Sequence, residues 1–449
     1  MIKRNIYEDL LKWKENPSRK PLIIRGARQV GKTTLIKSFA EGYKYKILLN
    51  LEKSSDKQIF EEFNNVKDII DVLLLKYNLT TENIDGLLLF IDEIQESPRA
   101  IKLLRYFYEE YPKIHVIAAG SLLEFSLKEI ENFPVGRVEY LYMHPINFLE
   151  YLSAIGNRNI LMQLNKIPVE KNAHSVLMEL FNNYAIIGGM PEIIKTYVEK
   201  RSLADLKRIY ESLWETFKDD MTKYASNKTE LNVIRHIVNT AYLNLDERVK
   251  FQNFGNSNYR SREVGEAMRT LESARFLFLI YPSTEVQIPI KPDMKKSPRL
   301  QFLDTGLINY KNGIQNELLA IKDLSTYYKG YLIPHIVTQE VISVNNLTNT
   351  KPNFWVREKT QSSAEVDLLI PFQGKVIPVE IKSGSVGKLR SLHQFMERTN
   401  HKFAVRIYGG EFSVQKVVSP NKKEFLLMNM PYYLGTKIFD YLEYFITSN

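Results

Sequence analysis

The chain has 449 residues, of which 44% are hydrophobic and 25% are charged, an ordinary composition for a globular protein of two or three domains. The net charge of +9 permits an acidic partner without requiring one. The absence of cysteine excludes disulfides and cysteine-ligated zinc. Because no apolar run reaches membrane length and residues 1–8 lead into an amphipathic segment, we expect a cytoplasmic protein without a membrane partner.

The first motif spans residues 26–34 and fits the Walker A pattern, a glycine, four residues and then Gly-Lys-Thr. Apolar residues precede it and helical spacing follows, so the pattern predicts a strand, a glycine-rich loop and a helix. Such a loop binds phosphates through backbone N–H groups and the helix N-terminus. We expect Lys32 to reach the β- and γ-phosphates of ATP and the Thr33 hydroxyl to bind Mg²⁺. The predicted ATP-binding residues are Gly26, Ala27, Arg28, Gln29, Val30, Gly31, Lys32, Thr33 and Thr34. The alternative is a chance Gly-Lys-Thr in an ordinary strand-to-helix turn.

A second motif, residues 87–93, joins an apolar run to two carboxylates. Such a run is typical of a central parallel strand buried on both faces, and ligands of open α/β sheets bind where strands end. We therefore expect Asp92 to hold magnesium through water and Glu93 to polarise the attacking water. The alternative is that the two acidic residues cap a helix N-terminus.

Further strands and helices alternate along the first third of the chain, which favours a doubly wound α/β fold with a parallel sheet. The predicted helices are 5–15, 58–77 and 99–110, and the predicted strands begin at 22 and cover 45–51 and 114–119. Ser121 ends the last of these strands, where it can sense the γ-phosphate. Arg137 follows in a loop, where an arginine can stabilise transition-state charge or reach a neighbouring subunit's nucleotide. A capping serine and a solvated arginine are the alternatives.

Together these motifs resemble those of AAA-type ATPases of bacteria and archaea that end in a domain of unknown function. Further matching stretches are 143–152, 187–192 and 302–307. The resemblance implies a P-loop ATPase domain over 1–155, a helical and winged-helix middle over 156–310, and a C-terminal α/β domain over 311–449 similar to restriction endonucleases. In related ATPases a Gly-x-Pro turn touches the adenine, which implies that role for Pro191.

The middle region shows winged-helix order, with predicted helices at 232–244, 247–253 and 261–274 and a strand at 276–281. If this region reads DNA, Arg260, Arg262 and Arg269 would face the groove or its phosphates. Alternatively, Arg262 and Arg269 form an ion-pair stripe with Glu266, or the module packs on the ATPase domain as a nucleotide sensor.

The C-terminal region holds a second set of charged residues on two predicted strands, 365–371 and 376–382, joined by a four-residue loop. If Pro371 pairs with Val376, Asp367 lies opposite Glu380 and Glu365 lies opposite Lys382. A magnesium ion would fit between Asp367 and Glu380, with Lys382 orienting a water or neutralising a phosphate. Glu340, in the preceding helix, could complete this nuclease site.

That arrangement resembles the restriction-endonuclease and Holliday-junction-resolvase superfamily. Pro378 is a departure, because a proline cannot donate a ladder hydrogen bond. The alternative keeps the fold and makes Glu365, Lys382 and their neighbours surface ion pairs. The remaining predicted elements are a helix over 388–399, a strand over 403–408 and a helix over 437–446.

Two functions are compatible with these features. The first is a Mg²⁺-dependent ATPase that couples ATP hydrolysis to the handling of nucleic acid through its nuclease-like domain, with DNA as a possible partner. The second is a nucleotide-regulated switch that acts on a protein partner or within a homo-oligomer and retains only a vestigial nuclease site. The modest charge surplus does not choose between them.

Overall fold

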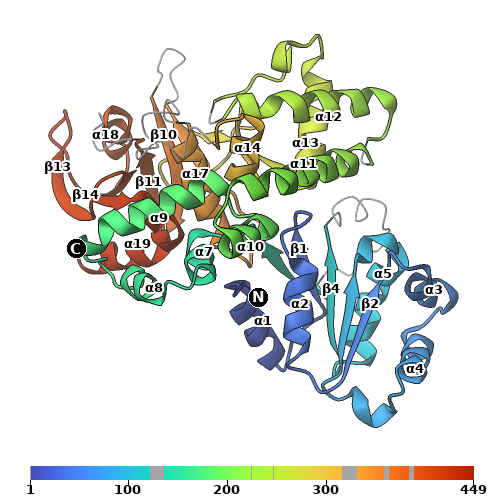
Figure 1. Cartoon of the computed structure of the whole chain (residues 1–449). Coiled ribbons are helices and arrows are strands. Elements are labelled where there is room, and N and C mark those ends of the chain that lie inside the picture. The colour runs from blue at the N-terminus through green and yellow to red at the C-terminus, as the bar shows by residue number, and fades with distance from the viewer. Residues whose placement is uncertain are drawn as a thin grey trace.

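The computed structural model describes residues 2–121, 136–223, 225–245, 247–315, 331–357, 364–383 and 389–449. An α/β domain at the N-terminus, a helical middle and a C-terminal domain around a second large sheet follow one another along the chain (Figure 1). Within the described ranges, no helix has the length and apolar character needed to span a membrane.

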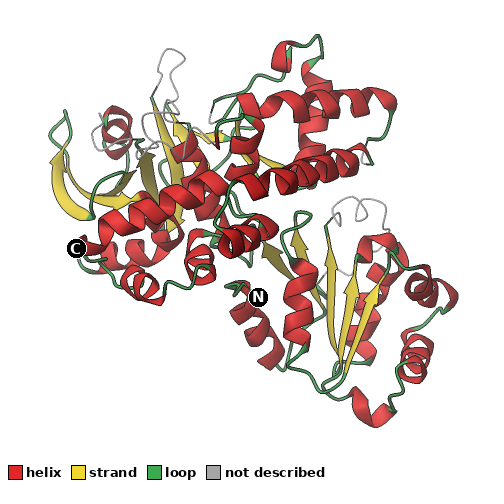
Figure 2. Cartoon of the chain, in the orientation of Figure 1, coloured by secondary structure: helices red, strands yellow, loops and turns green. Residues whose placement is uncertain are grey.

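The N-terminal sheet has five parallel strands in the order β2-β3-β4-β1-β5, and helices cover both of its faces (Figure 2). The strands are β1 (Leu22–Gly26), β2 (Lys46–Asn50), β3 (Leu88–Asp92), β4 (His115–Gly120) and β5 (Glu139–Met143). Ile24 packs in one core with α1 (Ile6–Glu15) and α2 (Lys32–Ala40). Its neighbour Ile23 packs in a second core with α3 (Ser54–Glu62), α4 (Val66–Lys76) and α5 (Pro98–Glu110). The predicted doubly wound parallel sheet is therefore confirmed.

The single helix expected over 58–77 is instead the pair α3 and α4. The chain is extended at Phe63 and Asn65, and the Asn65 side chain accepts a hydrogen bond from Asp68 N and begins α4. An asparagine cap competes with continuation of the helix, so the periodicity on its two sides belongs to two helices.

The middle of the chain is mainly helical. Its helices are α7 (Phe148–Ala154), α8 (Arg158–Leu164), α9 (His174–Ile187), α10 (Pro191–Lys200), α11 (Lys207–Thr222), α12 (Lys228–Thr240), α13 (Ser261–Ser273) and α14 (Thr305–Lys311). β6 (Leu277–Ile280) and β8 (Arg299–Phe302) pair antiparallel. The helix expected over 247–253 is wrong, because Arg248 forms a β-bridge with Arg299 and Val249 N donates to Pro298 O. The order of α12, this bridge, α13, β6 and β8 is compatible with a winged helix, which stays a prediction.

The C-terminal sheet has seven strands in the order β13-β14-β12-β11-β10-β9-β7. They are β7 (Pro282–Ser283), β9 (Asn353–Val356), β10 (Glu365–Phe372), β11 (Lys375–Ile381), β12 (Phe403–Tyr408), β13 (Ser413–Val418) and β14 (Glu424–Pro431), accompanied by α17 (Leu332–Ser343), α18 (Arg390–Met396) and α19 (Ile438–Thr447). β7 comes from the middle of the sequence, so the chain crosses between the two parts. Lys388, the expected start of the helix over 388–399, lies outside the described residues.

The hairpin of β10 and β11 has the expected register, with Pro371 opposite Val376. The expected four-residue loop is wrong, because the strands continue to Phe372 and Lys375. The turn consists of Gln373 and Gly374 with φ of 43° and 76°, the left-handed backbone that two-residue hairpin turns require.

Pro378 is compatible with this register. Lys382 N donates to Ile407 O of β12, and backbone N–H groups alternate in direction along a strand, so the nitrogen of Pro378 also faces β12. Pairing of β11 with β12 begins only at Val379. The N–H that Pro378 lacks would therefore lie just before the first hydrogen bond between these two strands.

Candidate functional site

The loop between β1 and α2 has the backbone of a phosphate-binding loop. Gln29 and Gly31 have φ of 63° and 96°, in the left-handed region. A Cβ at Gly26 would lie 2.4 Å from Met143 O of β5, so the chain turns there only with glycine. The tight turn ends at Lys32, the first residue of α2. The backbone N–H groups of the turn can donate hydrogen bonds to a bound anion.

Lys32 is enclosed by its own loop. Its Nζ donates to Gly26 O at 3.0 Å and to Ala27 O at 2.9 Å, and the residue is 6% exposed. Burial lowers the Lys32 pKa to about 8, against the opposing charges of Glu93 and Asp92. A phosphate oxygen would be a stronger partner for this ammonium than two carbonyls.

The two motifs meet at the end of β3, where Thr33 Oγ1 donates to Asp92 Oδ2 at 2.7 Å. Burial raises the Asp92 pKa, and the hydrogen bond from Thr33 partly opposes this shift. A hydroxyl and a carboxylate oxygen side by side suit Mg²⁺, which binds proteins through one or two such groups together with phosphates and water.

Glu93 follows with φ of 49°, and its Oε2 accepts a hydrogen bond from Gln95 Nε2 at 2.6 Å. Glu93 occupies the N-cap position of the short 3₁₀ helix Ile94–Glu96 but forms no side-chain cap hydrogen bond, and α5 beyond it is capped by Ser97. Ser121 directly follows β4, which lies between β1 and β3. It is buried, and its Oγ has no hydrogen-bond partner among the described residues. The three strand ends therefore bring Lys32, Asp92 and Ser121 to one edge of the sheet.

The helical middle reaches this edge in two places. Arg28 of the loop forms an ion pair with Asp220 of α11. Pro191 begins α10 beside the loop, and its Cγ would lie 3.7 Å from a Cβ placed on Gly31. Pro191 therefore lies beside the loop, and its contact with adenine stays a prediction.

Arg137 lies elsewhere. It precedes β5, whose first residue, Glu139, pairs with Leu22 at the start of β1, and its Nε binds Glu109 of α5 at 2.9 Å. The phosphate-binding loop follows the other end of β1. The structure therefore does not bring Arg137 to the edge where Lys32, Asp92 and Ser121 lie in its own chain, and a role at a neighbouring subunit stays a prediction.

In the C-terminal sheet, Asp367, Glu380 and Lys382 do lie together, but cations already hold the carboxylates. Arg299 of β8 binds Asp367 Oδ1 at 3.1 Å and Glu365 Oε2 at 2.7 Å. Arg248 binds Glu365 Oε1 at 2.8 Å, and Lys382 binds Glu380 at 2.5 Å. The other oxygen of Asp367 accepts the N–H of Ile381. The sequence predicts a metal between Asp367 and Glu380, whereas in the structure Arg299 contacts the first of these carboxylates and Lys382 contacts the second.

Glu380 is 5% exposed, and burial together with the nearby Asp367 charge raises its pKa to about 8. Lys382 opposes this shift and already occupies one oxygen of the carboxyl group. In the described part of the chain, no three His, Asp or Glu side chains are grouped so that they could hold a metal. The residues of this cluster therefore do not fit a bound Mg²⁺ in the conformation described.

Glu340 is not part of that cluster, so its expected place in a nuclease site is wrong. Its Oε1 contacts Tyr184 Oη at 2.7 Å, and its Oε2 accepts from Phe148 N at 3.0 Å. Both partners belong to the helical middle, α9 and α7. The reason is tertiary packing, because α17 turns this face toward those helices.

Among the middle arginines, Arg262 pairs with Glu266 at 2.9 Å on the exposed face of α13, as the ion-pair alternative expects. The sequence analysis missed Arg4, Asp220, Arg248 and Arg299. Each contacts its partners over long sequence separations, and no local pattern marks such a residue.

Comparisons with known proteins follow this division of the chain. Residues 18–152 match the family model of an AAA domain, 178–318 match a domain of unknown function, DUF8612, and 329–427 match another, DUF4143. The chain is similar to the uncharacterized protein MJ1637 of Methanocaldococcus jannaschii, 23% identical over 432 residues that cover 91% of this chain and 85% of that protein.

A solved structure, the Pif1 helicase from Candida albicans, is 16% identical and matches with a TM-score of 0.21 over 40% of this chain. The match spans 47% of that helicase, about half its length, and a score this low carries no argument. The AAA domain supports an AAA-type ATPase and implies nucleotide binding, usually with Mg²⁺.

Proposed function

We propose that this protein binds ATP with Mg²⁺ and hydrolyses it at the edge where β1, β3 and β4 end. The observation that carries the proposal is the 2.7 Å contact between Thr33 and Asp92, with Lys32 enclosed beside it. A metal-binding hydroxyl, a carboxylate and a phosphate-binding ammonium are the parts that phosphoryl transfer requires.

Each residue then has a distinct task. Lys32 leaves the carbonyls of Gly26 and Ala27 and binds the β- and γ-phosphates. Thr33 and Asp92 would hold Mg²⁺, which neutralises charge on the phosphates when bound. Glu93 accepts a proton from, or orients, the attacking water. Ser121, whose buried hydroxyl has no partner among the described residues, hydrogen bonds the γ-phosphate, and Pro191 contacts the adenine.

We further propose that the nucleotide acts as a switch on the packing of the helical middle. Arg28 joins the loop to Asp220, and the charge of Glu93 also acts on Arg28. Phosphates entering the loop would compete with Asp220 for Arg28. Arg299 pairs with Glu365 and Asp367, and Arg248 pairs with Glu365; we call these ion pairs the clamp. The clamp supports a C-terminal domain that transmits the conformational change or anchors the helical middle and does not cleave DNA.

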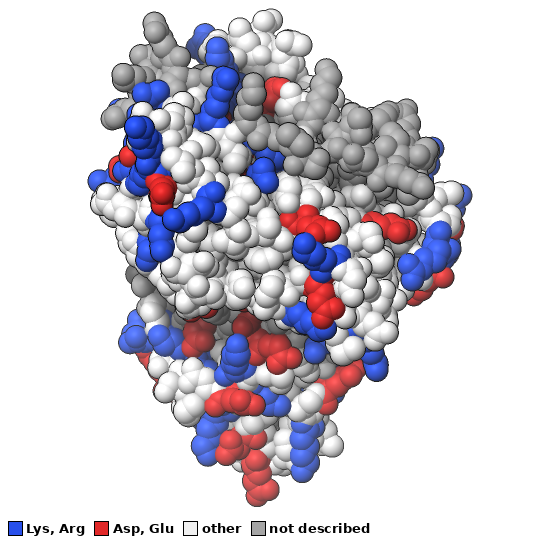
Figure 3. Space-filling view, turned by 90° about the vertical axis from the view of Figure 1, so that its left-hand side faces the viewer, with Lys and Arg blue, Asp and Glu red and all other residues white. Residues whose placement is uncertain are grey.

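Handling of nucleic acid is the second candidate. The net charge of +9 permits it without requiring it, and one face of the molecule favours it. Figure 3 shows Lys and Arg side chains gathered at its upper left with few acidic neighbours, whereas the two signs mix at its lower end. The exposed Arg262 on α13 is compatible with a phosphate contact.

Phosphate release from ATP, measured alone and with single-stranded, duplex and branched DNA, tests both candidates. We expect slow Mg²⁺-dependent release that is lost in Lys32→Ala. Stimulation by one form of DNA would favour nucleic-acid handling, and a rate indifferent to all forms would favour the switch. Release that persists in Lys32→Ala would refute the proposed ATP site.

The nuclease question has its own assay. We expect purified protein with Mg²⁺ or Mn²⁺ to leave plasmid DNA intact. Cleavage that disappears in both Asp367→Ala and Glu380→Ala would show instead that the carboxylates can release Arg299 and bind metal.

A further inference from the structure

Arg4, which lies before the first helix and outside every motif, contacts the phosphate-binding loop directly. Its Nη1 donates to Val30 O at 2.9 Å, its Nη2 donates to His144 O at 2.6 Å, and its Nε binds Glu150 Oε2 at 3.0 Å. Arg4 and Glu150 are 8% and 4% exposed. Because Val30 immediately precedes Gly31 and Lys32, a fixed Val30 carbonyl fixes the peptide units that present N–H groups to a phosphate.

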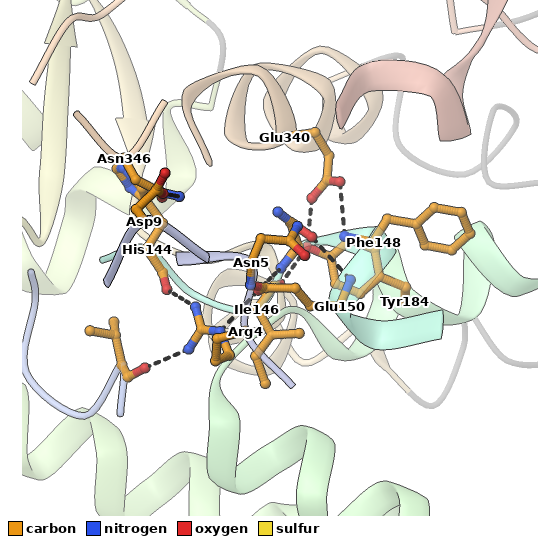
Figure 4. A network of polar contacts seen from close by, with 12 residues as sticks. Arg4, Asn5, Asp9, His144, Ile146, Phe148, Glu150, Tyr184, Glu340 and Asn346 are labelled. Atoms are coloured by element: carbon orange, nitrogen blue, oxygen red, sulfur yellow. Dashed lines mark hydrogen bonds and ion pairs between the residues drawn. The ribbon is translucent and has the colours of Figure 1, made fainter. Parts of the chain in front are cut away.

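Glu150 is itself held from several sides. Its carboxylate accepts hydrogen bonds from Asn5 N at 2.6 Å and from Asn147 N at 3.2 Å, while the Asn147 side chain caps α7 in return. The start of α7 is therefore a rigid support for Arg4. Figure 4 shows Arg4 and Glu150 facing one another between this segment and the N-terminus.

The same start of α7 is anchored by Glu340 of the C-terminal domain. Glu340 Oε2 accepts from Phe148 N at 3.0 Å, and Tyr184 Oη lies 2.7 Å from Glu340 Oε1 and 2.9 Å from Ile146 O (Figure 4). The Tyr184 hydroxyl can donate to either oxygen but has one proton for both, so a proton on Glu340 would let the two contacts form at the same time. Burial raises the Glu340 pKa to about 8, which agrees with a neutral carboxyl that donates a hydrogen bond.

A second contact joins the C-terminal domain to the ATPase domain beyond the end of α17. Asn346 O accepts from Tyr142 N of β5 at 2.7 Å, and the Asn346 side chain donates to Asp9 of α1 at 3.1 Å. The segment that carries Glu340 is therefore docked directly against the strand next to β1, and movement of α17 would disturb the support of the loop.

We propose that Arg4 and Glu340 are positioning residues for the nucleotide, and that through the start of α7 the C-terminal domain sets how tightly the loop binds ATP. The inference rests on the proposed ATP site. It assigns to Glu340 a structural hydrogen bond in place of a metal contact.

The test is binding of MgATP, followed with a fluorescent ATP analogue, by wild type, Arg4→Ala, Arg4→Lys, Glu340→Ala and Glu340→Gln. Arg4→Ala removes a charge-assisted hydrogen bond from the loop, so it should raise Kd about 10-fold or more. Guanidinium ion at millimolar concentrations should restore part of the affinity to Arg4→Ala but not to Lys32→Ala. Arg4→Lys should fall between wild type and Arg4→Ala.

Glu340→Gln keeps one donor and one acceptor, so its Kd should lie within about twofold of wild type, whereas Glu340→Ala should raise Kd about 3- to 10-fold. Arg99→Ala is the matched control, because Arg99 also binds two backbone carbonyls, of Glu61 and Phe63, away from the loop. Its Kd should equal that of wild type.

Equal Kd for wild type and Arg4→Ala, or equal losses in Glu340→Gln and Glu340→Ala, would overturn the inference. If Arg4→Ala does not fold, Arg4→Lys and the Glu340 pair decide it by the same criteria. Failure of wild type itself to bind MgATP would instead overturn the proposed function, so the two failures are distinguishable.

Discussion

The nucleotide edge and the carboxylate cluster of the C-terminal sheet both begin as short charged motifs at strand ends, but their surroundings differ. At the edge where β1, β3 and β4 end, Arg28 of the loop pairs with Asp220, but the hydrogen bonds that Lys32 and Asp92 form do not join these two residues to one another. Lys32 is held by two carbonyls and Asp92 by one hydroxyl, all partners that a ligand can replace. In the C-terminal cluster, Arg299 and Arg248 neutralise the carboxylates directly. A motif remains available for ligand chemistry only where its charges are not already paired.

The largest effect that this comparison predicts is loss of hydrolysis in Lys32→Ala. Removing the only enclosed ammonium of the described loop should lower the rate of phosphate release about 1,000-fold, measured at saturating Mg²⁺ and ATP. Lys37→Ala, on the exposed side of the same helix, is the control and should keep the wild-type rate. Comparable losses in both variants would mean that the helix, and not the ammonium, is at fault.

The next effect separates binding from chemistry. Glu93→Gln should lower kcat about 100-fold, because an amide cannot accept the proton of the attacking water, while the Kd for MgATP stays near wild type. Single-turnover kinetics and equilibrium binding measure the two quantities. Glu96→Gln, three residues later and exposed, should be silent, and a kcat near wild type in Glu93→Gln would remove Glu93 from the mechanism.

At the C-terminal cluster the expected effect is on stability. Arg299→Gln leaves Glu365 and Asp367 without their shared cation, so the free energy of unfolding should fall by about 2 kcal/mol, less than for a fully buried pair because all three groups retain some exposure. Denaturant titration measures this change. Arg262→Gln removes an exposed arginine from one ion pair and should leave the free energy of unfolding unchanged. An equally stable Arg299→Gln would show that the clamp contributes nothing.

The final prediction concerns the pH dependence of stability. Burial raises the pKa of Glu340 and of Glu380 from 4.5 to about 8 in each case, so the folded protein holds protons that the unfolded chain releases. Their contribution to stability is complete below about pH 4.5 and is lost as pH rises to about 8, by at most about 1.4 kcal/mol for each carboxyl and pH unit. Unfolding curves between pH 5 and 9 measure this slope.

Glu340→Gln should flatten that slope, since an amide does not titrate. A slope that is unchanged in Glu340→Gln would mean that Glu340 is ionised in the folded protein, and would contradict its assignment as a hydrogen-bond donor.

Local sequence patterns predicted the strands and helices well where an apolar run was continuous or where a turn fixed the pairing of two strands. The apolar runs of β1, β3 and β4 gave the parallel sheet, and the pairing of Pro371 with Val376 followed from the hairpin. Prediction failed where distant residues compete for the backbone. The segment 247–253 has helical spacing but extends a sheet, because Arg248 pairs with Arg299, about fifty residues along the chain.

By itself, the sequence determined the phosphate-binding loop and its carboxylate partner, because backbone geometry and charge within a few residues suffice to form them. Only the tertiary structure decided the fate of Glu340, Arg137 and the C-terminal carboxylates. Their chemistry depends on which cations, carbonyls and phenols pack against them from distant segments, and burial then fixes their charge state. Such neighbours leave no periodic trace in the sequence, so a residue's type predicts its capacity for chemistry and its packing decides whether that capacity is used.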